Sequence, residues 1–330
     1  MSAAMASPVP SDDPLLPHVP ARALAAAGVN PQTALPAMAR DPDIMRAIEM
    51  AVRDVPTEHR LLVGDSRRTG HLAPDSVHLV VTSPPYWNLK DYPTSPGQLG
   101  MIPDYTEFLD QLDEVWRQAF RLLVPGGRLI VVVGDVCIPR RRVGRHVVYP
   151  LHASIQERCR AIGFDNLAPI IWHKIGNIQL EADRPSRFLG KPYEPNAIVK
   201  NDIEYILFQR KPGAYRSPSL TARILSLIPE AKHREWFQQI WTVHGASTRN
   251  HPAPFPTGLA DRLIRMFSFV GDVVMDPFLG SGTTSLVASV TGRHSIGIDV
   301  EDSYVGMAQD RLRQHHGMFS SARISLEHQA

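Results

Sequence analysis

The sequence is short of cysteine, of net charge and of long hydrophobic runs, and each shortage excludes a class of protein. Cys137 and Cys159 are the only cysteines. Neither belongs to a Cys-x-x-Cys pair or has the spacing of a metal site, so we expect no disulfide framework and no bound metal. The formal net charge of +2 is too small for the whole molecule to attract a polyanion. No apolar stretch reaches the roughly 18–20 residues that span a bilayer, and no secretory signal is apparent, which predicts a cytoplasmic protein without a membrane partner.

What the chain does contain is a repeated alternation of short apolar runs with stretches of helical periodicity. A chain of 330 residues is long enough for one large domain with insertions. The alternation predicts an α/β fold with a doubly wound, mostly parallel sheet. The expected strands cover residues 61–63, 77–81, 128–134, 167–172, 203–208, 273–276 and 295–298, and the expected helices cover 43–52, 104–123, 151–162, 257–269, 283–290 and 303–313.

Other segments are expected to be extensions or insertions. Residues 1–58 are rich in alanine and proline, and we expect about the first twenty to be disordered or loosely attached. The insertion at residues 211–251 interleaves basic residues with tryptophan and histidine, a composition suited to a polyanion that carries stacked bases. Residues 317–330 are predicted to be a polar tail.

The stretch at residues 82–87, Thr-Ser-Pro-Pro-Tyr-Trp, directly follows an expected buried strand. The two prolines lack N–H groups and fix φ near −65°, and the serine is held extended by the proline after it. The result is a stiff turn that presents a hydroxyl, freed carbonyls and an aromatic ring, which suits a flat ring bearing an amino group. An ordinary structural turn is the alternative.

A second motif, Asp-Pro-Phe-Leu-Gly-Ser-Gly-Thr at residues 276–283, joins an apolar strand to a helix through a glycine-bearing turn. This geometry suits a nucleotide-like ligand. No lysine follows the second glycine, and the third glycine of a pyrophosphate loop is missing, so adenosine without phosphates is favoured. Asp299 follows the next strand, about twenty residues later, where an acid accepts hydrogen bonds from ribose hydroxyls.

Two further groups stand at expected carboxyl ends of strands. Asp65 follows the first strand in a Gly-Asp-Ser turn, and a plain turn residue is the alternative. A basic cluster without a nearby acid follows the third strand, where it either contacts phosphates or forms a solvated loop. This cluster contains Arg140, Arg141, Arg142 and Arg145.

Together these motifs resemble the β-class S-adenosylmethionine-dependent DNA amino-methyltransferases, in which the target-amino motif precedes the cofactor motif. The resemblance covers about residues 59–315. It implies a seven-stranded, Rossmann-like methyltransferase sheet, circularly permuted, built from residues 59–210 and 252–316, with residues 211–251 as a smaller target-recognition insertion. Its two motif strands are neighbours, although the two motifs lie 193 residues apart. It implies S-adenosylmethionine as cofactor, bound by Asp65, Thr82, Phe255, Asp276, Pro277, Phe278, Gly280, Gly282, Thr283 and Asp299.

The resemblance also implies a mechanism and its catalytic residues, Ser83, Pro84, Pro85 and Tyr86. The Ser83 hydroxyl and the Pro84 carbonyl accept hydrogen bonds from an exocyclic amino group, which stabilises the positive charge that develops on its nitrogen. Tyr86 stacks on a base flipped out of the duplex, and the methyl group is transferred directly. Neither cysteine follows a proline, as the nucleophile of a cytosine-C5 methyltransferase would.

Serine at position 83 resembles the N4-cytosine enzymes, whereas the N6-adenine enzymes mostly carry aspartate. We therefore expect N4-methylation of cytosine in double-stranded DNA, with N6-methylation of adenine as the first alternative. A silent cofactor-binding DNA module and an RNA or protein acceptor are further alternatives. The protein is expected to be a monomer or homodimer, with a cognate restriction endonuclease as a candidate partner. The candidate DNA contacts are Arg140, Arg141, Arg142, Arg145, Lys191 and Arg234.

Overall fold

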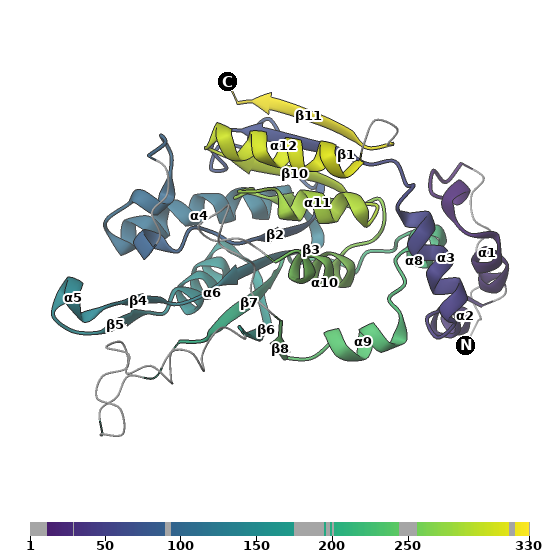
Figure 1. The fold of residues 1–330 in the computed structure, drawn as a ribbon, viewed down its shortest axis with the longest axis horizontal. Helices are drawn as coiled ribbons and strands as arrows, with labels where there is room; N and C mark the ends of the chain where they lie inside the picture. The colour runs from purple at the N-terminus through teal and green to yellow at the C-terminus, as the bar shows by residue number, and fades with distance from the viewer. Residues whose placement is uncertain are drawn as a thin grey trace.

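The computed structural model describes residues 12–28, 30–89, 94–174, 195, 199, 201–243, 256–316 and 321–329. Within these residues the centre of the protein is a nine-stranded sheet in the order β11-β1-β10-β9-β2-β3-β7-β6-β8 (Figure 1). Strand β7 pairs antiparallel with β3 and with β6, and all other neighbours in the sheet are parallel. The strands are β1 (Glu58–Val63), β2 (Val77–Thr82), β3 (Leu123–Val133), β6 (Asp165–His173), β7 (Ile203–Arg210), β8 (Ile240–Thr242), β9 (Val273–Asp276), β10 (His294–Asp299) and β11 (Arg323–His328).

The expected α/β fold is confirmed, and the sheet is larger than expected by its two edge strands. All seven predicted strands are present, while β8 lies in the expected insertion and β11 in the expected polar tail. In β11, Ile324 and Leu326 alternate with polar residues and pack beside Leu312 of the last helix. Two half-buried apolar residues form too short an alternating pattern for an edge strand to be predicted from the sequence.

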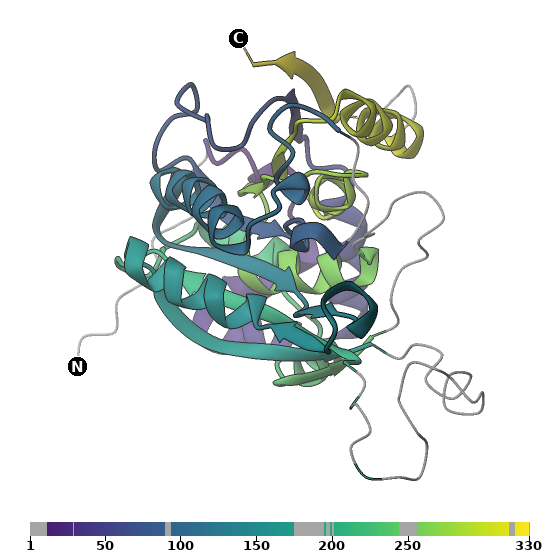
Figure 2. The same cartoon turned by 90° about the vertical axis from the view of Figure 1, so that its left-hand side faces the viewer.

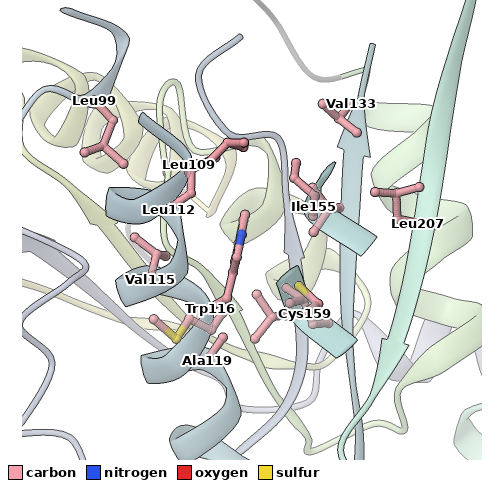
Figure 3. Packing of buried hydrophobic residues seen from close by; sticks show 14 of the residues in the cluster. Leu99, Leu109, Leu112, Val115, Trp116, Ala119, Val133, Ile155, Cys159 and Leu207 are labelled. Atoms are coloured by element: carbon pink, nitrogen blue, oxygen red, sulfur yellow. The ribbon is translucent and has the colours of Figure 1, made fainter. Parts of the chain in front are cut away.

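Helices cover both faces of the sheet. One face carries α4 (Tyr105–Leu122) and α6 (Leu151–Ile162), and the other carries α10 (Thr257–Phe267) and α11 (Thr283–Val290), with α12 (Asp302–His316) beside α11. Successive strand residues point to opposite faces, so a strand covered on both sides is apolar at nearly every position. Figure 3 shows the α4 side, where Trp116 and Cys159 are packed between the helices and the sheet.

The central pairing brings the two sequence motifs together. Strands β2 and β9 are parallel neighbours, with Leu79 opposite Val274 and Val80 opposite Met275. Their carboxyl ends therefore lie at the same edge of the sheet, where ligands bind in open α/β folds. The predicted adjacency of these two strands is confirmed.

The N-terminal segment packs on the body of the protein at the amino ends of the strands (Figure 1). It contains η1 (Leu16–His18), α1 (Ala21–Ala27), α2 (Pro31–Met38) and α3 (Pro42–Val52), which pack against α8 (Leu220–Leu225). Residues 12–20, expected to be loosely attached, are held by the packing of Leu15 and by a hydrogen bond from Thr221 to Asp13. Residues 1–11 lie outside the described residues.

A narrow hairpin projects beyond the carboxyl edge of the sheet (Figures 1 and 2). It consists of the antiparallel strands β4 (Val136–Ile138) and β5 (Val147–Tyr149), with the short helix α5 (Arg140–Val143) at its tip. We call residues 136–149 the basic hairpin. Short 3-10 turns η2 (Trp87–Leu89) and η3 (Leu99–Met101) lie near its base, and α9 (Glu230–Trp236) precedes β8.

Candidate active site

A cleft opens where β1, β10, β9 and β2 end, and we call it the first cleft. Its volume is about 830 Å³ with the open solvent at its mouth included, within the range of roughly 300–1,000 Å³ that small-molecule sites occupy. Its walls are Gly64, Asp65, Ser66, Ser83, Pro85, Gly97, Gln98, Leu99, Asp276, Pro277, Phe278, Leu279, Gly280, Ser281, Thr283, Asp299, Val300 and Tyr304. The structure thus gathers most of the predicted cofactor residues around one space. Phe255 lies outside the described residues.

Asp276 fixes the floor of the first cleft. Its carboxylate accepts hydrogen bonds from the hydroxyls of Thr82 (2.7 Å) and Thr284 (2.8 Å) and from the Phe278 amide (3.0 Å). Burial raises the pKa of Asp276 to about 7, although these three hydrogen bonds oppose the rise. Thr82 does not line the cleft; its hydroxyl orients Asp276 and links β2 to β9.

Asp299 lies at the end of β10 and holds the glycine turn, residues 280–283. Its carboxylate accepts the Gly280 amide at 2.8 Å and the Glu301 amide at 3.0 Å. Burial raises the pKa of Asp299 to about 6, so the group is ionised at neutral pH. Each oxygen therefore has lone pairs left for a ligand in the cleft.

The glycine turn is compressed against α12. Gly282 has φ +74°, and a Cβ atom there would lie 2.5 Å from the Ala308 Cβ. Arg311, also on α12, donates to the Ser281 carbonyl (3.1 Å) and to the Thr283 hydroxyl (3.0 Å). The sequence analysis missed Arg311, because nothing in the local pattern shows that α12 packs beside this turn.

Asp65 occupies the far wall of the first cleft, where Arg67 holds it. The Arg67 guanidinium grips both carboxylate oxygens, at 2.6 Å from one and 2.9 Å from the other. Burial opposes ionisation of Asp65, but the hydrogen bonds and charge of Arg67 outweigh it and lower the pKa. Gly97, Gln98 and Tyr304 complete this side, and the sequence analysis missed them because their segments carry no recognisable motif.

The charge of the first cleft restricts what it can bind. Three carboxylates line it, those of Asp65, Asp276 and Asp299, and no lysine or arginine does so among the described residues. A phosphate group would be repelled, whereas a ligand with a positive charge would be attracted. The cleft therefore fits an adenosine that carries a cationic group better than a dinucleotide.

A second cleft lies on the other side of the proline turn, residues 83–86. Ser83 and Pro85 line the first cleft. Tyr86 lines the second cleft, together with residues at the carboxyl end of β3 and at the amino end of its neighbour β7. The Ser83 hydroxyl lies 3.5 Å from the Tyr86 hydroxyl. The second cleft has a volume of about 810 Å³ with open solvent included, and its walls are Tyr86, Leu89, Gly134, Asp135, Cys137, Lys174, Asn201, Asp202, Ile203 and Glu204.

The second cleft is polar, with its charges held in pairs. Lys174 forms an ion pair with Glu204. The Asp135 carboxylate accepts a hydrogen bond from the His152 ring at 2.6 Å, and the Asp202 carboxylate lies 3.4 Å from the His173 ring. Acids outnumber lysines and arginines in its walls. Such a space suits a flat heterocycle with donors and acceptors on its edge rather than a phosphodiester.

The candidate DNA contacts do not form one surface. The four arginines 140, 141, 142 and 145 are exposed on the basic hairpin and have no acidic partner among the described residues. Arg234 lies apart from them on α9, where it pairs with Glu230 at 3.3 Å, and α9 precedes β8 at the amino-end side of the sheet (Figure 1). Lys191 lies outside the described residues.

The two tryptophans of residues 211–251 do not provide an exposed stacking surface. Trp236 is 5% exposed and Trp241 2% exposed, and both belong to the core beneath the sheet. Lys232, which lies over the Trp236 ring, pairs with Glu49 at 2.9 Å. Buried aromatics cannot be distinguished from stacking platforms by composition alone.

The sheet order, the acidic cleft at its carboxyl edge and the two motifs beside it define an α/β protein of the methyltransferase class. A family model described as DNA methylase (N6_N4_Mtase) matches residues 77–310, and the chain belongs to this family. The matched range contains both motifs and excludes α1, α2, α3 and β11. No helix among the described residues has both the length and the apolar character needed to cross a membrane.

Individual relatives agree with this assignment. The chain is 34% identical over 290 residues to the type II methyltransferase M.MjaI of Methanocaldococcus jannaschii, covering 78% of this chain and 92% of that one. A Thermus thermophilus protein described as a DNA modification methylase, solved in complex with S-adenosyl-L-methionine, is 49% identical, with 82% of this chain and 99% of the other covered and a TM-score of 0.68. The PvuII cytosine-N4-specific DNA methyltransferase has the same fold at 21% identity, with a TM-score of 0.54 and 77% and 88% of the two chains covered.

Proposed function

We propose that the protein transfers a methyl group from S-adenosylmethionine to the exocyclic N4 amino group of a cytosine flipped out of double-stranded DNA. The observation that carries this proposal is the position of the proline turn, which lies between the first cleft, lined by the glycine turn and Asp299, and the polar second cleft, lined by Tyr86. Family membership supports DNA as the substrate.

The residues of the first cleft fit S-adenosylmethionine, which supplies an electrophilic methyl group on a positively charged sulfur. Asp299 is placed to accept hydrogen bonds from the ribose hydroxyls, as acids at this position of such folds do. Phe278 and Pro277 offer an apolar surface, and the ionised Asp299 compensates the sulfonium charge. The related Thermus structure, which contains this cofactor, supports the assignment.

The proline turn performs the chemistry on the base. The Ser83 hydroxyl and the Pro84 carbonyl accept hydrogen bonds from the amino group, which favours a pyramidal nitrogen with its lone pair directed toward the first cleft. These acceptors stabilise positive charge as it develops on that nitrogen. Tyr86 stacks on the ring in the second cleft. Alignment of the two ligands across the turn then supplies much of the rate.

Serine at position 83 supports cytosine over adenine as the target. The neutral hydroxyl is the feature that resembles the N4-cytosine enzymes, and adenine N6-methylation is the alternative. The deciding experiment incubates the protein with labelled S-adenosylmethionine and plasmid DNA, digests the product to nucleosides and identifies the labelled one. N4-methylcytosine is expected. Label in N6-methyladenine would move the specificity to adenine. The same incubation is repeated with RNA and with protein in place of DNA, and label in one of these but not in DNA would remove DNA as the substrate.

Cofactor affinity should fall in acid because Asp299 takes up a proton. With its pKa raised to about 6, the group loses its charge and an acceptor site below that pH. We expect the dissociation constant of S-adenosylmethionine, measured by calorimetry from pH 7.5 to pH 5, to rise below about pH 6 by up to tenfold per unit. Asp299→Asn should remove the part of this pH dependence centred near pH 6 and leave any part centred near pH 7, where Asp276 titrates.

The same pKa shift has the opposite effect on folding stability. Between pH 6 and the ordinary value of 3.8, the folded protein holds this proton more tightly than the unfolded chain, so protonation of Asp299 stabilises the folded state. Thermal unfolding measured at each pH therefore separates weaker binding from unfolding. Affinity that is constant across this range would contradict the role assigned to Asp299.

The basic hairpin is the proposed contact with the DNA backbone. The slope of log K against log salt is negative, and each phosphate contact removed makes it less steep by about 0.9. Joint replacement of Arg140, Arg141 and Arg142 by alanine should therefore reduce the steepness by up to about three units, measured by anisotropy between about 50 and 200 mM salt. Arg46→Ala serves as the control: this exposed arginine on α3 pairs with Asp43 at 3.2 Å, and its loss should leave the slope unchanged. Equal slopes for wild type and triple variant would exclude the hairpin.

We also propose a division of the chain into functional regions. Residues 59–210 and 252–316 form the catalytic and cofactor-binding domain. Residues 211–251, of which 244–251 lie outside the described residues, form the target-recognition region. Type II methyltransferases among the relatives favour a role in restriction and modification, with a cognate endonuclease as partner, in the cytoplasm.

A further inference from the structure

Trp87, the residue after the proline turn, has a strained backbone. Its φ is +46°, and only one other non-glycine residue among those described, Asp75, has a positive φ. Bulky side chains avoid this region, and such strain persists only where surrounding contacts hold it. Because Trp87 directly follows Tyr86, a change in the backbone angles of Trp87 also moves the proline turn.

Three contacts hold Trp87 in place. Its indole N–H donates to the Ile102 carbonyl at 2.9 Å. Its ring forms T-shaped pairs with the rings of Tyr105 and Tyr149, with distances between ring centroids of 5.2 Å and 5.0 Å. Tyr105 and Tyr149 also contact each other at 4.7 Å. We call these three rings the aromatic joint, and Trp87 is only 7% exposed within it.

The aromatic joint connects three separate elements. Trp87 belongs to η2, directly after the proline turn, Tyr105 is the first residue of α4, and Tyr149 is the last residue of β5. Tyr149 pairs with Val136 at the base of the basic hairpin. The hairpin that presents arginines at its tip is therefore packed, at its base, against the residue that fixes the catalytic turn.

We infer that Trp87 is a positioning residue that couples phosphate contacts on the basic hairpin to the placement of Ser83 and Tyr86. A shift of the hairpin on binding DNA moves Tyr149, which forms one wall of the joint, and the strained Trp87 backbone transmits that shift to the turn. The inference rests on the proposed function, since it assigns the hairpin to DNA and the turn to the base. Trp87 itself lines neither cleft.

The first test is spectroscopic and does not depend on methyl transfer. The full-length protein is titrated with duplex DNA, binding is followed by anisotropy, and tryptophan emission is recorded for wild type, Trp87→Phe and Trp236→Phe. The last is a matched control, because Trp236 is also buried but lies in α9. We expect a DNA-dependent emission change that Trp87→Phe loses and Trp236→Phe retains. Binding without an emission change, or a full change in Trp87→Phe, would overturn the coupling.

The second test separates positioning from general stability. Trp87→Leu, which removes the aromatic contacts, should lower kcat by about 10²-fold, as misplacement of reacting groups by about 1 Å does. Trp87→Phe, which keeps a ring against both tyrosines, should recover most of that loss. The KM for S-adenosylmethionine should stay unchanged. An unchanged kcat in Trp87→Leu, or an equal loss in Trp236→Leu, would contradict the inference.

The two tests also keep this inference distinct from the proposed function. A wild-type protein that shows the Trp87-dependent emission change on DNA, yet transfers no methyl group to any DNA, would refute the proposed function and support the coupling. A wild-type protein that methylates DNA, with a Trp87→Leu variant of equal kcat, would support the function and refute the coupling.

Discussion

Replacing Ser83 by alanine should lower kcat for methyl transfer to DNA by about 10²–10³-fold, the loss found when one preorganised hydrogen-bonding group is removed from a developing charge. The hydroxyl accepts from the amino group, and the Pro84 carbonyl alone cannot hold both hydrogens. The measurement is single-turnover transfer of labelled methyl groups at saturating cofactor. Cofactor binding, measured by calorimetry, should persist, because Asp299 and the glycine turn remain intact.

A control that flanks the other end of β2 makes this result specific. Ser76 lies at the opposite end of β2, where its hydroxyl donates only to the Ala73 carbonyl. Ser76→Ala should leave transfer unchanged. Full activity in Ser83→Ala would remove the hydroxyl from the mechanism, and loss of cofactor binding would show that the serine acts in the first cleft instead.

Replacing Gly282 by alanine should cause a large loss of folding stability. The added Cβ would meet the Ala308 Cβ at 2.5 Å and its Cα at 3.0 Å, and φ of +74° is unfavourable for an L-residue by about 1–2 kcal/mol. Overpacking adds roughly 1–3 kcal/mol. We therefore expect the free energy of unfolding, measured by urea titration, to fall by about 2–5 kcal/mol.

The same substitution should weaken cofactor binding, since relief of the clash displaces the turn that Asp299 and Arg311 hold. Gly306→Ala is the matched control on α12. No atom lies within 4 Å of the Cβ it adds, and alanine favours a helix over glycine by about 1 kcal/mol, so it should be neutral or stabilising. Wild-type stability in Gly282→Ala would contradict the close packing of the glycine turn on α12.

Several elements could be predicted from local sequence because their signals are local. The β-branched runs that became β2, β3 and β9, and the helical periodicity of α4, needed no tertiary information. The Asp104 side chain caps the Glu107 amide at 2.9 Å, as its position before an amphipathic stretch indicates. The proline turn and the glycine turn were recognisable for the same reason, since proline and glycine restrict or permit the backbone wherever they occur.

Residues whose roles depend on packing between distant segments could not be predicted. Arg311 was missed because its hydrogen bond reaches the Ser281 carbonyl, 30 residues earlier in the chain. The burial of Trp236 and Trp241 could not be predicted, because composition does not say whether an aromatic ring is covered. The same holds for β11, whose pairing with β1 depends on a neighbour more than two hundred residues earlier.

The sequence by itself determined which chemistry this chain carries: a serine hydroxyl held by two prolines, a glycine turn without a phosphate-binding lysine, and an acid one strand later. These follow from covalent structure and short-range sterics. The tertiary structure alone decided that the two motifs share an edge and that Trp87 joins the proline turn to the basic hairpin. It also decided that, in the part of the chain that the structure describes, the first cleft is lined by three carboxylates and by no lysine or arginine. Those facts depend on strand order and on which faces bury each other, and both are set by contacts between residues far apart in the chain.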